Sequence, residues 1–244
     1  MANWSDPRSD IAGFGGATAA RGAAFDAGLR SYMLSVYNYM ASGVLLTGVV
    51  ALLFASSGMA ASVFTGPGIL KYIVMFAPLL FVMVLSFGIN RLSTVAAQGL
   101  FWAYAAVMGV SLSYIFLAYT GTSIAQTFFA TAAAFAGLSL WGYTTKKDLS
   151  GFGTFLIMGV VGLLVASLIN IFMKSNAMSL VISGVGVLLF AGLTAYDTQK
   201  IKSIYAQVAG TDMMGKSVVM GALNLYLDFI NMFMFLLRLF GDRR

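Results

Sequence analysis

The chain contains no cysteine and no histidine, and all eight of its acidic residues are aspartates. The absence of cysteine excludes disulfide and thiol chemistry. The absence of histidine removes the commonest metal ligand and the usual proton switch near neutral pH. The aspartates are therefore the side chains left to bind a hard cation or to titrate below neutral pH. No bound cofactor is expected.

Charged residues of any kind are scarce, at 9% of the 244 residues, while 60% are hydrophobic. A soluble globular protein carries about 25% charged residues, so the composition predicts an integral membrane protein. The formal net charge is +6, but the basic residues stand at the ends of apolar segments, where they set orientation in the membrane. We expect membrane lipid as the surroundings and no binding of nucleic acid.

Charge-poor runs divide the chain into seven apolar segments. Each is close to the roughly 20 residues that cross a bilayer core, and such segments are helices because lipid leaves no partner for an unpaired backbone group. The predicted fold is an all-α membrane protein, a seven-transmembrane-helix bundle. The expected helices cover residues 31–57, 72–90, two stretches of 92–145 that meet near 119–123, 149–173, 175–196 and 217–237.

The first 30 residues differ from the rest, because they are polar and carry three arginines and three aspartates. They lack an apolar core followed by a small-residue cleavage site, so they are not a signal peptide. The predicted organisation is a mobile cytoplasmic tail at 1–30, a transmembrane domain at 31–241 and a basic C-terminus at 242–244.

Lysine and arginine are unevenly shared between the two sides of the bundle. With the N-terminus in the cytoplasm, nine basic residues fall inside, against Lys71 and Lys174 outside. This bias predicts a cytoplasmic N-terminus. The last segment, "RLFGDRR", carries three further basic residues. Either the last helix turns back, or this segment is an exception outside; both alternatives stay open.

Three ionisable side chains fall in the inner half of the bundle: Arg91, Asp197 and Asp228. An aspartate at the centre of a membrane helix costs about 2.5–3.5 kcal/mol on insertion scales. Two carboxyl groups in contact cannot easily both ionise, so they share a proton and titrate as a unit. We expect Asp197 and Asp228 to form a pH-sensing pair that contacts cations, with Arg91 as its gating partner. The alternative is a buried Asp–Arg pair that only fixes helix register.

The seventh helix also carries a polar stripe. Its polar residues are Asn224, Asp228, Asn231 and Arg238. At about 100° per residue these four stay within about 80° of one another, and such a stripe cannot face lipid. The last helix is therefore expected at the centre of the bundle, with Asn224 and Asn231 as further polar lining.

The segments "GVGVLLFAGLTAYDTQKI" (184–201) and "ALNLYLDFINMFMFLLRLFG" (222–241) resemble the Bax inhibitor-1 family, also called transmembrane Bax inhibitor motif proteins, in its bacterial form. The resemblance covers about residues 30–241. It implies a seven-helix fold with the last helix central and a calcium leak controlled by pH through an aspartate pair. The matching positions are Asp197 and Asp228, and Arg91 in "NRLS" resembles the basic partner. The location implied is a bacterial inner membrane.

The chain departs from that family pattern in two places. It has a long polar connection at 199–216, and it has no acidic residue in the second or third helix. Calcium takes six to eight oxygen ligands, of which two carboxylates supply only a part. A weak, incomplete site at Asp197 and Asp228 suits passage of calcium better than storage, because a conducted ion must also leave.

Three other classes of protein compete with a channel. An intramembrane aspartyl protease would match "AYD" (195–197), but "LYLD" (225–228) lacks the glycines of its second motif. A retinal protein needs a lysine in the seventh helix, and 217–237 has none. We therefore expect no enzymatic activity. The resemblance to the Bax inhibitor-1 family also implies an alternative, a regulatory binding partner of a membrane quality-control protease, which would dock through the exposed tail at 1–30.

Overall fold

The computed structural model describes residues 8–89 and 91–244, and the side chains from residue 22 onward within those ranges. The first seven residues of the expected tail lie outside the described residues. The helices are α1 (Arg8–Ser56), α2 (Met59–Thr65), α3 (Leu70–Gly88), α4 (Thr94–Leu112), α5 (Ile115–Ala118), α6 (Gly121–Thr144), α7 (Ser150–Met173), α8 (Asn176–Val208) and α9 (Met213–Phe240).

The predicted all-α fold with seven membrane spans is confirmed. Among the described residues, seven stretches are long and apolar enough to cross a membrane, with α4 and α5 together making one of them and α2 making none. The described part of the chain contains no strand, although Tyr119 and Arg243 form an isolated antiparallel bridge.

Hydroxyl side chains directly before the helices cap several of them. Ser93 accepts a hydrogen bond from the backbone N–H of Ala96 at 3.1 Å, and Ser175 accepts one from Met178 at 3.3 Å. Thr120 does the same at the start of α6. These caps satisfy N–H groups that a helix leaves unpaired at its beginning, so they mark where α4, α6 and α8 start.

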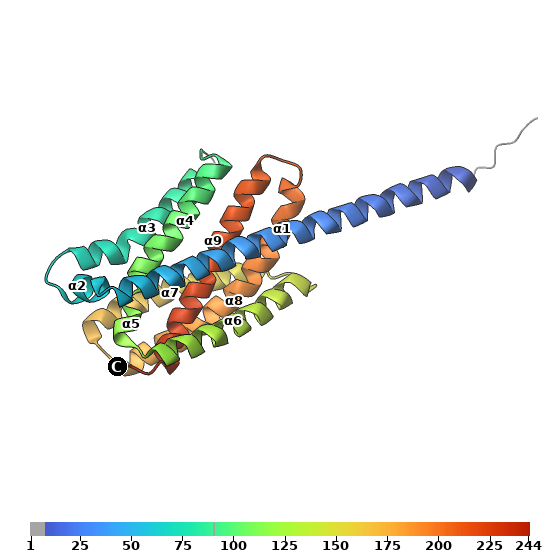
Figure 1. Cartoon of the computed structure of the whole chain (residues 1–244). Helices are drawn as coiled ribbons and strands as arrows, with labels where there is room; N and C mark the ends of the chain where they lie inside the picture. Colours follow the sequence, from blue (N-terminus) through green and yellow to red (C-terminus); the bar gives the residue numbers. More distant parts are fainter. Residues whose placement is uncertain (1–7, 90) are drawn as a thin grey trace, which may run out of the picture.

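The last helix is central, as predicted. α9 packs against α8, α1, α6 and α4 (Figure 1). In its most apolar stretch, 67% of the residues are buried, whereas the corresponding share is 39% or less in each of the other spans. Most of its length is therefore shielded from lipid by the other helices.

Several predicted helix ends differ from the structure, two of them by more than ten residues. α8 continues to Val208, well beyond the apolar span predicted at 175–196. The sequence also allows this helix to extend beyond Lys202, whereas the expected polar connection at 199–216 is wrong. The turn before α9 comprises only residues 209–212. α1 begins at Arg8 and crosses residue 30 without a break, and Figure 1 shows its first turns projecting beyond the bundle. The division of the chain at residue 30 stays a prediction.

The C-terminus lies at the opposite end of the bundle from the projecting part of α1 (Figure 1). The backbone N–H of Thr120 donates to the carbonyl of Asp242 at 3.0 Å, and the N–H of Arg244 donates to Ala118 at 3.0 Å. The N–H of Asp242 also donates to Ser123 Oγ at 2.9 Å. α9 is therefore one continuous helix that ends beside α5 and α6 and does not turn back. That the final basic residues lie on the outside of the membrane stays a prediction.

Candidate functional site

The structure brings Asp197 of α8 and Asp228 of α9 together. A side-chain hydrogen bond joins their two carboxyl groups. Asp228 is buried, with 4% of its surface exposed, and Asp197 is half-buried. A carboxylate only accepts hydrogen bonds, so a bond between two carboxyl groups requires a proton on one of them. The pair is therefore built to hold one proton.

The two aspartates meet because α8 continues as a helix beyond its apolar part and reaches the short turn that leads into α9. Asp197 lies 11 residues before the end of α8 at Val208, and Asp228 lies 15 residues after the start of α9 at Met213. At 1.5 Å per residue these distances are roughly 17 and 23 Å from the α8–α9 turn. The two helices run antiparallel from that turn, so both carboxyl groups reach a similar depth in the bundle.

One oxygen of the pair has spare capacity to accept a ligand. Oδ2 of Asp228 is buried and accepts no hydrogen bond from the N–H and O–H donors of the described side chains and backbone. A buried carboxyl oxygen without a donor is uncommon in folded proteins. Such an oxygen is available to a proton or to a cation that enters the site.

A cation on α8 interacts with one member of the pair. Lys200 interacts electrostatically with Asp197, and its Nζ lies 5.8 Å from the centre of the Tyr196 ring. Arg91 is exposed in the connection between α3 and α4. Its role as gating partner stays a prediction, and Lys200 is a residue that the sequence reasoning missed.

The two asparagines of the expected lining are half-buried. Asn231 donates from Nδ2 to the carbonyl of Leu227, one turn earlier, at 2.8 Å. Arg238, which the polar stripe also placed inside, is exposed, with its guanidinium 5.8 Å from the Phe235 ring. The stripe thus runs from the interior at Asp228 to the rim of the bundle. The role of Asn224 and Asn231 as polar lining stays a prediction.

A chain of hydroxyl groups that the sequence reasoning missed ends at Thr198, the residue after Asp197. Tyr37 Oη lies 2.6 Å from Ser139 Oγ, and Ser139 Oγ lies 2.8 Å from Thr198 Oγ1. Thr198 in turn donates to the carbonyl of Thr194 at 2.7 Å. These contacts tie α1 and α6 to α8 at the residue next to Asp197. Close packing supports them, because a Cβ on Gly142 would lie 2.3 Å from the carbonyl oxygen of Ala195.

A second buried set of polar contacts fixes α9 on its other side. Thr47 Oγ1 donates to the carbonyl of Ala105 at 2.8 Å and lies 2.7 Å from Tyr226 Oη. The ring of Tyr226 packs edge-on against Tyr104 and Phe101. α1, α4 and α9 are therefore held together two residues before Asp228.

As a cation site the pair is incomplete. Within the described residues, no cluster of three or more aspartate, glutamate, histidine or cysteine side chains could hold a metal ion. Two carboxyl groups fill only part of the six to eight oxygen positions that calcium takes. The geometry therefore fits weak, transient contact with a hydrated cation.

The chain matches the family model described as "Inhibitor of apoptosis-promoting Bax1" over residues 29–244. It belongs to the Bax inhibitor-1 family. Among its relatives is the uncharacterized protein RP147 of Rickettsia prowazekii, 48% identical over 228 residues that make up 93% of this chain and 96% of the relative. Another is the inner membrane protein YbhL of Escherichia coli (strain K12), 46% identical over 220 residues, or 89% of this chain and 94% of YbhL.

The family match and the seven spans together establish a multi-pass membrane protein of the Bax inhibitor-1 family. The name of YbhL describes an inner membrane protein, and the family description names an inhibitor of apoptosis-promoting Bax1. In this Bax inhibitor-1 member, the conspicuous chemistry of the interior is the Asp197–Asp228 pair.

Proposed function

We propose that this protein is a pH-sensitive calcium leak channel of the bacterial inner membrane, gated by the Asp197–Asp228 pair. The observation that carries the proposal is the hydrogen bond between two carboxyl groups, one of them buried, on the two helices with the most extensive mutual packing. Inner-membrane location is supported by the likeness to YbhL. The cytoplasmic N-terminus follows from the distribution of basic residues.

The gate works through the shared proton. While the proton bridges the carboxyl groups, it holds α8 against α9, and α9 fills the centre of the bundle. When the proton leaves, two negative charges face each other in a low dielectric and repel. The helices then separate, and the two ionised carboxylates become oxygen ligands for a divalent cation. A change of pH and a passing calcium ion thus act on the same contact.

Nearby cations adjust the stability of the ionised pair. Lys200 already interacts with Asp197. We propose that Arg91, from the α3–α4 connection, latches the closed state when its flexible side chain turns toward the pair. Asn224 and Asn231 would supply neutral oxygen atoms along the path of the ion.

The test is calcium flux into liposomes that hold the purified full-length chain and a calcium-sensitive dye, measured between about pH 5 and 8. Wild-type flux changes with pH, and Asp228→Asn and Asp197→Asn flatten that profile because an amide cannot share a titrating proton. Asp148→Asn, an exposed loop aspartate, is the matched control and keeps the wild-type profile. Arg91→Ala raises the resting leak. Pair variants that keep the wild-type pH dependence would overturn the gating mechanism.

A second candidate function is regulation of a membrane quality-control protease by docking. One observation favours it: α1 continues as a helix beyond the rest of the bundle (Figure 1). Its contact with the end of α8 is at Phe25, whose ring lies 5.0 Å from that of Tyr205. Deleting residues 1–21 spares that contact. The deletion abolishes co-purification with a protease if docking is the function, and leaves calcium flux intact if the channel is the function.

A further inference from the structure

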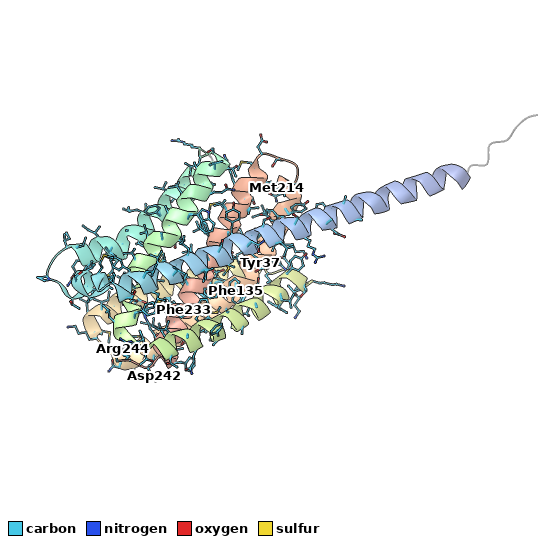
Figure 2. All side chains as sticks on the ribbon, viewed as in Figure 1. Tyr37, Phe135, Met214, Phe233, Asp242 and Arg244 are labelled. Atoms are coloured by element: carbon cyan, nitrogen blue, oxygen red, sulfur yellow. The ribbon has the colours of Figure 1, made fainter. Side chains whose placement is uncertain are left out.

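A groove runs along the bundle between α1 and α6. Both helices pack against α9, and the space between them has a volume of about 770 Å³, with Phe229 of α9 contributing to its wall. A second hollow of about 300 Å³ continues it toward the C-terminal end of the bundle. Figure 2 shows Tyr37 and Phe135 at the gap between α1 and α6, with Phe233 further along.

The walls of the groove are almost entirely apolar. α1 contributes Met33, Met40 and Leu45, and α6 contributes Phe128 and Phe135. These residues belong to membrane-spanning stretches, so the groove lies at the depth of the lipid acyl chains. An apolar hollow at that depth gains from a hydrocarbon occupant, because empty space forfeits dispersion contacts along its lining.

One end of the groove is positively charged. Arg30, exposed on α1, lines that end, and Tyr143 of α6 lines it from the other side. Lys202 sits on Tyr143, with Nζ donating to its carbonyl at 2.8 Å and lying 4.7 Å from its ring centre. Asp26, one turn before Arg30, offsets one of these two charges. The sequence predicts that the first span begins at residue 31, so we expect this charged end at the level of the lipid phosphates.

The length of the groove suits a lipid acyl chain. From Arg30 to Leu45 the groove follows α1 over 15 residue steps, which is roughly 22 Å at 1.5 Å per residue. One leaflet of the hydrocarbon core is about 15 Å thick, so the groove is long enough to hold an acyl chain of one leaflet along its whole extent.

We infer that this groove is a phospholipid-binding site: one acyl chain lies between α1 and α6, and the lipid phosphate binds Arg30 with Lys202 close by. Arginine suits a phosphate because its planar donors can engage two oxygens at once. The inference does not rest on calcium transport. It assigns a bound lipid to a face of the bundle that packing between protein helices leaves open.

The test places the purified full-length protein in vesicles of phosphatidylethanolamine and phosphatidylglycerol that contain a phosphatidylglycerol with a photoreactive acyl chain. After irradiation, mass spectrometry maps the labelled residues. Labelling concentrates on the groove walls of α1 and α6 relative to exposed residues of α7. Ala136→Trp fills the groove and lowers labelling there about tenfold. Ala134→Trp, the same change at an exposed alanine of α6 outside the groove, leaves it unchanged.

A second pair of variants tests the phosphate contact. Arg30→Gln lowers groove labelling, whereas Lys147→Gln, with the same loss of charge in the exposed α6–α7 loop, does not. Even labelling of α1, α6 and α7, or labelling insensitive to Ala136→Trp, would reduce the site to ordinary surrounding lipid and overturn the inference. Equal labelling of the Arg30→Gln and Lys147→Gln variants would refute the phosphate contact.

Discussion

α7 and α9 are both membrane-spanning helices, but they occupy opposite environments. In the most apolar stretch of each helix, 11% of the residues are buried in α7 and 67% in α9. α7 exposes large side chains such as Phe155 and Phe172, whereas α9 buries Asp228 and Tyr226. The more apolar helix is the outer one. In lipid, an apolar surface needs no cover, so it is polar side chains that mark the interior of a bundle.

Glycine also has different roles at the α8–α9 interface and on the lipid-facing side of α7. A Cβ on Gly186 of α8, which packs on α9, would lie 2.7 Å from the ring of Phe235, whereas a Cβ on Gly162 of α7 would meet nothing within 4 Å. The interior face therefore depends on small residues to bring helices close, while the lipid-facing surface of α7 tolerates added volume. The same substitution should thus have opposite effects in the two regions.

The largest difference in stability is expected between two glycine-to-alanine variants. Gly186→Ala forces Phe235 to move in a packed interface and lowers the free energy of unfolding by about 1–3 kcal/mol. Gly162→Ala adds a methyl group on the lipid side and is neutral or stabilising by up to about 1 kcal/mol, because alanine is the better helix former. Thermal unfolding in detergent measures both. Equal losses in the two variants would break the comparison between α7 and the α8–α9 interface.

The sequence predicts the inner position of α9 and the pairing of its aspartate, because Asp228 is costly anywhere else. It does not predict the end of α8, because charges end a membrane span but not a helix. Lys202 is satisfied by Tyr143, and Gln199 accepts from the N–H of Leu149 and donates to the carbonyl of Lys147, each at 2.8 Å. The polar part of α8 therefore stays helical while it packs against the α6–α7 loop.

The hydroxyl contacts are not predictable from residue type, because serine and threonine serve two purposes in membrane helices. Ser167 of α7 donates to the carbonyl of Leu163 in its own helix at 2.7 Å, whereas Ser139 connects two neighbouring helices. Whether a hydroxyl bonds within its own helix or to another helix depends on which residues of a neighbouring helix face it in the folded protein. The same holds for Lys200, whose proximity to Asp197 follows from the extension of α8.

A smaller difference is expected from removing one hydroxyl in each region. Thr47→Val deletes the group that bonds Tyr226 and Ala105 and leaves a buried phenol without that partner, at a loss of about 1 kcal/mol. Ser167→Ala deletes a bond within one helix and changes stability by no more than a few tenths of a kcal/mol. Chemical denaturation in mixed micelles compares the two. A loss in Ser167→Ala as large as that in Thr47→Val would show that position relative to α9 does not decide the value of a hydroxyl.

The smallest effect is expected from the aspartate at the start of α7, which contrasts with Asp228 in α9. Asp148 is exposed, and its Oδ1 accepts from the N–H of Ser150 at 2.9 Å. The Ser150 side chain and backbone N–H hold the pKa of Asp148 below its usual value. Its contact with Ser150 therefore stabilises the start of α7 at every pH above the unfolded carboxyl pKa of about 3.9, and is lost only as the pH falls through the lower folded value.

From about pH 5 to 8 Asp148 keeps its charge in both folded and unfolded states, so it adds no pH dependence there. Asp148→Ala should speed amide hydrogen exchange in the first turn of α7, because a capping acceptor is gone, while the pH profile of calcium flux keeps its shape. An altered flux profile in this variant would mean that an exposed acid also senses pH. In that case burial would not be the reason that Asp228 senses pH, because the exposed Asp148 would do so as well. The contrast between α9 and α7 would then rest on helix packing alone.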